Sequence, residues 1–271
     1  MEHEGVASAL IAAGGLRFNA AEPFILVSRK ICPVYVDVRQ LTTDSEGWRV
    51  AVDGLVGLAR GLGTIDSISG GELADLFFSV PVALELGLPH VAIRKQAKGY
   101  GTGGQLVGKV GPGSRLLHVS DLITTGSSAL KWVNVIRAAG GKIKDYATVF
   151  DRNQGGRETL RGSGVDLHPL LELDEDFLTF AVSRNALAMG QVGEVKSYLG
   201  DPEGWAHRFL RAKPDFLTER INAVDGRITR SDGLEVLAEG YPELEPEIGN
   251  ILRTRLRNIG LDVGLLPPGK P

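Results

Sequence analysis

The segment RLLHVSDLITTGSSALKWV, residues 115–133, holds the residues whose types and spacing are best suited to chemistry. An apolar run ends in Ser120 and Asp121, and a short loop leads into a helical pattern; the loop residues are Thr124, Thr125, Gly126, Ser127 and Ser128. Successive backbone N–H groups, hydroxyls and the positive end of a helix dipole form a cradle for an anion such as phosphate. A carboxylate before the loop could hold sugar hydroxyls or the water shell of a magnesium ion. An ordinary strand-to-helix turn with a serine N-cap explains the same residues about equally well.

A cationic segment lies upstream, in AIRKQAKGYGTGGQLVGKV, residues 92–110. Arg94, Lys95 and Lys98 precede a glycine-rich stretch that contains Tyr100. Cations on a flexible loop suit a lid that closes over a polyanion and excludes water from it. Taken alone, a solvated basic hairpin is the commoner explanation of such a segment.

Alternating short patterns predict the elements that must position these residues. Apolar runs indicate strands at 33–38, 64–69, 90–95, 115–121, 145–151 and 165–173. Helical spacing indicates helices at 52–63, 78–88 and 128–141. This alternation is typical of βαβ units with right-handed crossovers and a parallel sheet. Prolines become frequent after residue 200, so we predict an α/β domain over 1–199 and a helical extension over 200–271.

The predicted strands also place two individual residues, Arg152 and His118. Arg152 comes directly after Asp151 at the predicted carboxyl end of a strand, which is the edge where open α/β sheets bind ligands. An Arg–Asp surface pair is the alternative. His118 lies inside an apolar run, and we predict a packed core histidine there, not a metal ligand.

Composition narrows the class of protein. The 271 residues are 43% hydrophobic and 23% charged, an ordinary globular balance. The net charge of -3 argues against a general nucleic-acid binder. A single cysteine, Cys32, excludes an intramolecular disulfide and a cysteine zinc cage. No uncharged apolar stretch reaches the about 18 residues of a membrane span, and the acidic N-terminus lacks a signal peptide's basic region. We therefore expect a cytoplasmic protein with neither nucleic acid nor membrane as partner.

Five segments together resemble one enzyme family. HVSDLITTGSSA resembles the signature that binds phosphoribosyl pyrophosphate (PRPP) in type I phosphoribosyltransferases. The other segments resemble orotate phosphoribosyltransferase in particular: FILVSRKICPVYVDVR (24–39), GGELADLFFSVPVALELGLP (70–89), AIRKQAKGYGTGGQLVGKV (92–110) and FDRNQGGRETL (150–160). They stand in the family's order and cover residues 24–173, while the part after residue 200 is not covered.

The resemblance implies a fold and an activity. The fold is the type I phosphoribosyltransferase fold, a central, mainly parallel sheet flanked by helices, with an N-terminal hood segment. The activity is transfer of phosphoribose from PRPP to orotate, giving orotidine 5′-monophosphate and pyrophosphate in pyrimidine (UMP) biosynthesis, with Mg²⁺ as cofactor. A homodimer with shared active sites is implied as well, because the family's lid reaches into the neighbouring subunit.

The resemblance also implies roles for single residues. Lys98 and Asp121 are expected to be catalytic, and Asp121 to contact magnesium indirectly. Arg152 is expected to pair with the orotate carboxylate, which suits a planar guanidinium. The other expected substrate-binding residues are Arg94, Lys95, Tyr100, Thr124, Thr125, Gly126, Ser127 and Ser128.

Four positions depart from the family's pattern. Ser120 stands where the first of two acidic residues is usual, so we expect PRPP to be held less tightly. Asp75 and Phe77 replace the usual glycine and proline of the pyrophosphate loop, and we expect Asp75 to repel phosphate. On this reasoning Ser120→Asp, and then Asp75→Gly with Phe77→Pro, would tighten PRPP binding. Arg29 replaces a glycine of the hood and could reshape the base pocket.

These departures leave two alternatives to orotate phosphoribosyl transfer open. One is a phosphoribosyltransferase for another base. The other is a non-catalytic, nucleotide-sensing regulatory protein on the same fold, since a fold alone does not fix a function.

Overall fold

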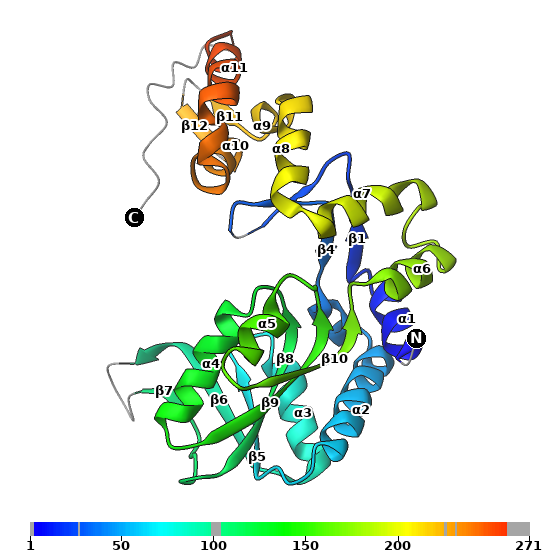
Figure 1. Cartoon of the computed structure of the whole chain (residues 1–271), viewed down its shortest axis with the longest axis vertical. Helices are drawn as coiled ribbons and strands as arrows, with labels where there is room; N and C mark the ends of the chain where they lie inside the picture. The colour runs from blue at the N-terminus through cyan, green and yellow to red at the C-terminus, as the bar shows by residue number, and fades with distance from the viewer. Residues whose placement is uncertain (1–2, 27, 99–103, 225–226, 231, 259–271) are drawn as a thin grey trace. The chain divides into compact units, whose positions relative to one another are not determined.

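The structure, a computed structural model, describes residues 3–26, 28–98, 104–224, 227–230 and 232–258 (Figure 1). The chain divides into two compact units. The first, here called the sheet unit, consists of Met1–Leu16 and Val36–Ala186. The second, here called the helical unit, consists of Arg17–Tyr35 and Leu187–Pro271.

The sheet unit is built on a six-stranded sheet with the strand order β10-β9-β8-β5-β6-β7. Its strands are β5 (Ser67–Gly71), β6 (His90–Lys98), β7 (Gly104–Val107), β8 (Arg115–Ile123), β9 (Lys142–Asp151) and β10 (Asp166–Glu172). Strands β10, β9, β8, β5 and β6 pair in parallel, and only β7 runs antiparallel, against β6. This confirms the predicted mainly parallel sheet. The carboxyl ends of its parallel strands therefore lie along one edge.

Helices cover both faces of this sheet. Figure 1 shows α4 and α5 on one face and α2 and α3 on the other. The helices of the unit are α1 (Glu4–Ala12), α2 (Ser45–Gly61), α3 (Leu76–Leu86), α4 (Ser127–Ala138), α5 (Gly156–Arg161) and α6 (Glu175–Ser183), with a 3₁₀ turn η1 (Val38–Thr43). On the α4 face, Trp132, Val133 and Ile136 pack with Leu116 and Tyr146 in one apolar cluster. Ile123 at the end of β8 and Ala129 in the first turn of α4 belong to the same cluster, so the start of α4 is packed against the end of β8.

The predicted helices are all present, with shifted ends. The helix expected at 52–63 begins earlier, as α2 at Ser45, because the Asp44 side chain accepts hydrogen bonds from the backbone N–H groups of Glu46 and Gly47. The strand expected at 33–38 is shorter, β4 (Val34–Val36), and pairs with β1 (Leu16–Phe18). None of the helices in the described ranges combines the length and apolar character needed to cross a lipid bilayer.

The helical unit has an aromatic core of its own. Trp205 stacks on Phe209, and Tyr198 and Phe216 meet these rings edge-on, with ring centroids 5.1–5.5 Å apart. The elements of the unit are the hairpin β2 (Phe24–Ile25) and β3 (Ile31–Cys32), then α7 (Met189–Gly200), α8 (Pro202–Ala212), α9 (Asp215–Thr218), β11 (Asn222–Val224), β12 (Arg227–Arg230), α10 (Asp232–Glu235), η2 (Val236–Gly240), η3 (Pro242–Leu244) and α11 (Glu245–Asn258).

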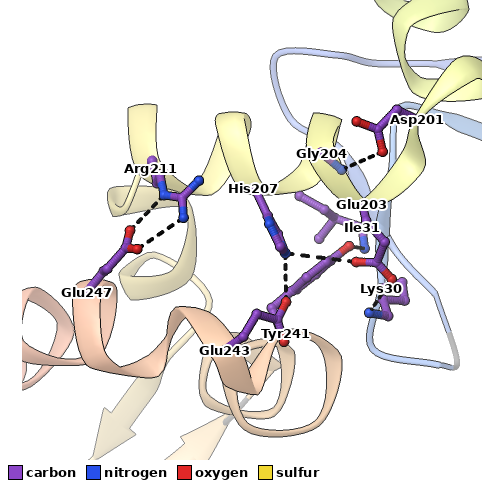
Figure 2. Close-up of polar contacts among 10 residues, drawn as sticks. All are labelled: Lys30, Ile31, Asp201, Glu203, Gly204, His207, Arg211, Tyr241, Glu243 and Glu247. Carbon is purple, nitrogen blue, oxygen red and sulfur yellow. Dashed lines mark hydrogen bonds and ion pairs between the residues drawn. The ribbon is translucent and has the colours of Figure 1, made fainter.

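This division differs from the predicted boundary at 199/200. Residues from Leu187 onward group with the extension because α7 packs on α8, where the Tyr198 and Trp205 rings meet. Residues 17–35 group with it too. The Tyr241 hydroxyl accepts a hydrogen bond of 3.0 Å from the buried backbone N–H of Ile31, and Lys30 Nζ lies 2.7 Å from Glu203 Oε1 (Figure 2).

A polar network completes the attachment of the hairpin. Glu203 and His207 lie one turn apart on α8, and His207 Nε2 is 2.6 Å from Glu243 Oε1 and 4.0 Å from Glu203 Oε2 (Figure 2). Lys30 Nζ also lies 4.4 Å from the centroid of the Tyr241 ring. The network thus ties together α8, η3 and the β2–β3 turn, three parts of the chain that are distant in sequence.

Arg29 belongs to the same attachment. Its guanidinium forms ion pairs with Glu235, with Asp232 at 3.8 Å and with Glu239 at 3.9 Å. The backbone of Arg29 has a φ of 61°, in the left-handed region where glycine is the least strained residue. The side chain of Arg29 is therefore held by carboxylates of the helical unit, and its effect on the base pocket stays a prediction.

Tyr241→Phe should destabilise the helical unit. The substitution leaves the N–H of Ile31, whose residue is 1% exposed, without its acceptor. Such a loss costs about 1–3 kcal/mol. Urea unfolding followed by circular dichroism measures the difference. Glu247→Gln, which removes only an exposed ion pair with Arg211, is the control and should have a smaller effect. Equal effects would show that the Tyr241 hydrogen bond does not hold the hairpin.

Candidate active site

A cavity of about 370 Å³ opens at the carboxyl edge of the parallel strands. Its walls come from the loop between β5 and α3, from the end of β8, and from the loop and first turn of α4. All of these elements belong to the sheet unit. The cavity therefore lies where the sequence pattern predicts a ligand site, beyond the ends of adjacent parallel strands.

The predicted phosphate loop forms one side of this cavity. Gly126 precedes α4 with a φ of 80°, and a Cβ there would lie 2.9 Å from Thr159 Cβ, so only glycine fits. The first N–H groups of a helix have no partner within the helix and can bind an anion. Thr124, Gly126, Ser127 and Ser128 all line the cavity. Thr125 is not among the lining residues; its backbone oxygen accepts a hydrogen bond of 2.8 Å from the Thr159 hydroxyl.

Two carboxyl groups meet at the inner wall. Asp121 lies near the carboxyl end of β8, and its backbone N–H donates a hydrogen bond to Oδ1 of Asp75 at 3.3 Å. The two side chains are also hydrogen-bonded to each other. Burial, and then the negative charge of Asp75, raises the pKa of Asp121 to about 8. The pair therefore keeps a proton at neutral pH.

A buried chain of hydrogen bonds holds Asp75 from behind. Its Oδ2 accepts from the backbone N–H of Gly71 at 2.9 Å and lies 3.3 Å from Nε2 of His118. Because a carboxylate accepts, this contact places the proton of His118 on Nε2, and Nδ1 then accepts from the Ser69 hydroxyl at 3.0 Å. His118 is fully buried and stacks on Tyr146, as a core histidine should. Its polar role was not predicted.

Ser120 is turned into the protein. The residue is 2% exposed, its hydroxyl donates to the backbone oxygen of Leu122 at 3.2 Å, and it is hydrogen-bonded to the Tyr146 hydroxyl. It contributes to the cavity wall, but its hydroxyl is already used within the protein. Ser120 therefore does not simply offer PRPP a weaker hydrogen bond in place of the acidic residue that is usual at this position.

Among the described residues, the cations Lys95 and Arg39 line the cavity. Lys95 lines it, and its backbone N–H donates to Glu72 Oε1 at 2.9 Å. Arg39 also lines it, and pairs with Asp37 at 2.6 Å. Arg94, the neighbour of Lys95 on β6, is not among the lining residues. Lys98 is the last residue of β6, paired in register with Gly104, and Tyr100 lies outside the described residues.

Arg152 lies at the expected edge of the sheet. It follows the last residue of β9, is 5% exposed, and its backbone N–H donates to the oxygen of Ile123 at 3.0 Å. This confirms its position beside the end of β8, although it is not among the residues that line the cavity. Its contact with a ligand stays a prediction.

Arg39 and Trp132 line the cavity as well, although the sequence analysis named neither as a site residue. Trp132 lies one turn after Ser128 on α4, a spacing that could have placed it beside the loop. A Cβ on Gly71 would lie 2.6 Å from Trp132 Cε2, so the pyrophosphate loop passes directly against the indole.

Stability should depend on pH through Asp121. Its pKa is about 8 in the folded protein against an ordinary 3.8, so the folded state keeps a proton that the unfolded chain releases. The free energy of unfolding should therefore fall as pH rises from about 4 to about 8. Asp121→Asn should remove this part of the pH dependence.

Urea unfolding at pH 5, 6.5 and 8 measures the free energy of unfolding of the Asp121→Asn variant and of wild type. The value for the variant minus the value for wild type should increase as the pH rises. The exposed Asp53→Asn on α2 is the control, and should give a constant difference. A constant difference for Asp121→Asn as well would contradict the assignment.

Known proteins supply the last line of support. No family model matches the chain. The orotate phosphoribosyltransferase of Dinoroseobacter shibae is 36% identical over an alignment of 209 residues, and the match covers 74% of this chain and 92% of that protein. Among solved structures, the orotate phosphoribosyltransferase of Aeropyrum pernix superposes with a TM-score of 0.58 at 28% identity, covering 68% of this chain and 99% of that one.

A second solved structure, the Leishmania donovani UMP synthase, gives a TM-score of 0.64 at 26% identity. The match covers 72% of this chain and spans 41% of the length of that one. The predicted type I phosphoribosyltransferase fold is thus confirmed. With the bacterial relative aligned over nearly its full length, the chain belongs to the orotate phosphoribosyltransferase family.

Proposed function

We propose that this protein transfers phosphoribose from PRPP to orotate, giving orotidine 5′-monophosphate and pyrophosphate. The observation that carries the proposal is the loop at Thr124–Ser128, which leads into the N-terminus of α4 and shares a cavity with the carboxyl group of Asp121, in a chain aligned with orotate phosphoribosyltransferases. A phosphate cradle beside a sugar-binding carboxyl group suits a phosphorylated ribose. No observation favours another base or a non-catalytic regulatory role.

The loop binds the 5′-phosphate of PRPP in this proposal. The first N–H groups of α4 and the hydroxyls of Ser127 and Ser128 donate hydrogen bonds to phosphate oxygens. The helix dipole adds favourable electrostatic interaction with the dianion. Asp121 then faces the ribose hydroxyls, whose hydrogen bonds orient the anomeric carbon.

The cations act on the leaving group. Negative charge builds on pyrophosphate as its bond to the anomeric carbon breaks, while the ribose gains positive character. Lys95 and Arg39 line the cavity and stabilise that developing negative charge. In this proposal, Lys98 of the partner subunit completes the set when the partner's lid covers the site and excludes water.

Orotate recognition falls to Arg152. The residue lies at the carboxyl end of β9, next to the end of β8 that carries Asp121. Its guanidinium forms two parallel hydrogen bonds with the carboxylate of orotate in this proposal. The attacking ring nitrogen is thereby directed at the anomeric carbon.

The residues present fit a magnesium ion bound together with PRPP. Asp121 places a carboxyl group in the cavity wall, and Mg²⁺ prefers such oxygens with substrate phosphates completing its shell. Magnesium, when bound, supplies positive charge to the pyrophosphate. Asp121 would interact with it through water. The magnesium ion, the homodimer with shared sites and the cytoplasmic location all remain predictions.

The direct test of the function is conversion of orotate. Purified protein with PRPP and magnesium should consume orotate and release one pyrophosphate for each orotidine 5′-monophosphate formed. Adenine, hypoxanthine and uracil serve as competing bases and should react far more slowly. Absence of orotate conversion, with conversion of another base, would replace orotate in the proposal.

Lys98→Ala should lower turnover by more than tenfold without unfolding the protein. A lid lysine that stabilises the leaving group acts in the transition state, so kcat falls more than the KM for orotate rises. Steady-state kinetics measures both constants. Lys142→Ala, an exposed lysine at the opposite end of the sheet, is the matched control. Full turnover by Lys98→Ala would exclude the lid assignment.

Mixed dimers test the shared site. Lys98→Ala chains and Asp121→Ala chains are each expected to be nearly inactive. If each site takes its lid from the partner, mixing them should restore up to about a quarter of wild-type activity, because half of the dimers are hybrids with one intact site of two. An active protein that is monomeric in sedimentation would rule this arrangement out.

A further inference from the structure

Strand β8 brings one carboxylate, Asp121, to the cavity, and the neighbouring position is occupied by Ser120. A second carboxylate nevertheless stands beside Asp121, and it comes from a different element. We propose that Asp75, in the loop between β5 and α3, supplies the carboxylate that β8 lacks and acts as a positioning residue that holds Asp121 for the ribose of PRPP. This inference rests on the proposed function.

The topology of the sheet brings Asp75 close to the end of β8. Strands β5 and β8 are parallel neighbours, with Ser69 paired to His118. The chain that leaves β5 therefore passes the end of β8, and Asp75 arrives 3.3 Å from the backbone N–H of Asp121. A residue 46 positions upstream thus comes to lie beside the site of the missing acidic residue.

The hydrogen bonds of Asp75 show that its carboxylate is fixed in place. One oxygen accepts from Gly71 N–H and from His118, and the other contacts Asp121. The side chain is only 12% exposed. The Asp75 carboxylate therefore faces Asp121, and its negative charge is compensated by three hydrogen-bond donors. These are the N–H groups of Gly71 and Asp121 and the ring of His118. The carboxylate does not stand open to repel the pyrophosphate, as the sequence had suggested.

The contact also explains an otherwise odd pair of buried polar residues. His118 and Ser69 are both fully buried in the sheet, where polar groups need a reason to be present. Ser69 orients His118, and His118 orients Asp75. Asp121 is held in turn by Asp75 and by the N–H of Leu122, 2.7 Å from its Oδ1. A carboxyl group fixed on both sides is preorganised for two ribose hydroxyls.

The experiment compares the dissociation constant of PRPP with magnesium, by calorimetry, in wild type, Asp75→Asn and Asp75→Gly. The isosteric Asp75→Asn should weaken binding about tenfold, the difference between a charge-assisted and a neutral hydrogen bond. Asp75→Gly should weaken it further. The KM for orotate should stay unchanged in Asp75→Asn, because the contact acts on the ribose alone. The exposed Asp53→Asn is the matched control.

Rescue separates positioning from a general structural role. Ser120→Asp in the Asp75→Gly background returns a carboxylate to β8, and should restore PRPP binding to within about threefold of wild type. Ser120→Asp alone should not tighten binding, because Asp75 already fills that role. Thermal unfolding of every variant shows which of them are folded.

The possible results of these experiments distinguish failure of the inference from failure of the proposed function. Folded Asp75 variants that bind PRPP as tightly as wild type, or more tightly, overturn the inference while the proposed function stands. Loss of binding that Ser120→Asp does not rescue, or unfolding of both Asp75 variants, shows that Asp75 serves the fold alone and also overturns it. A wild-type protein that neither binds PRPP nor converts orotate overturns the proposed function itself, and the inference with it.

Discussion

The contact between the carboxyl groups of Asp75 and Asp121 organises the inner wall of the cavity. It exists because β5 and β8 are parallel neighbours, so that the chain leaving one strand passes the end of the other. Two carboxyl groups this close cannot both ionise cheaply in a buried position, and they are held by shared protons and by His118. The polar core of the sheet and the ligand-facing wall are therefore one connected hydrogen-bonded system.

Backbone constraints hold the opposite wall. Gly126 provides a left-handed turn before α4, and any side chain there would meet Thr159. Gly71 allows the neighbouring loop to pass against Trp132, in the middle of the same helix. These two close approaches bring the loop at Thr124–Ser128 and the loop between β5 and α3 to the same cavity. Burial of Trp132 in the core beneath α4 then makes the spacing between them rigid.

The local parts of this site were predictable from sequence, and the long-range ones were not. The loop at Thr124–Ser128 is encoded within one strand–loop–helix unit, and β9 places Arg152 at the same edge by strand order. The environment of Asp75 depends on partners 43 and 46 residues away, so only its residue type could be read, and its charge suggested repulsion. The ion pairs of Arg29 could not be predicted for the same reason, since its carboxylate partners lie some 200 residues later in the helical unit.

A crystal structure with PRPP and magnesium bound tests the central claim most directly, because it shows which groups meet the ribose and which meet the phosphate. The account predicts the 5′-phosphate on the backbone N–H groups at Thr124–Ser128, with the two ribose hydroxyls within hydrogen-bond distance of Asp121. It also predicts that Asp75 keeps its contacts with His118 and Asp121. A 5′-phosphate bound elsewhere, or an Asp75 turned away from Asp121 with the ribose held by other side chains, would contradict it.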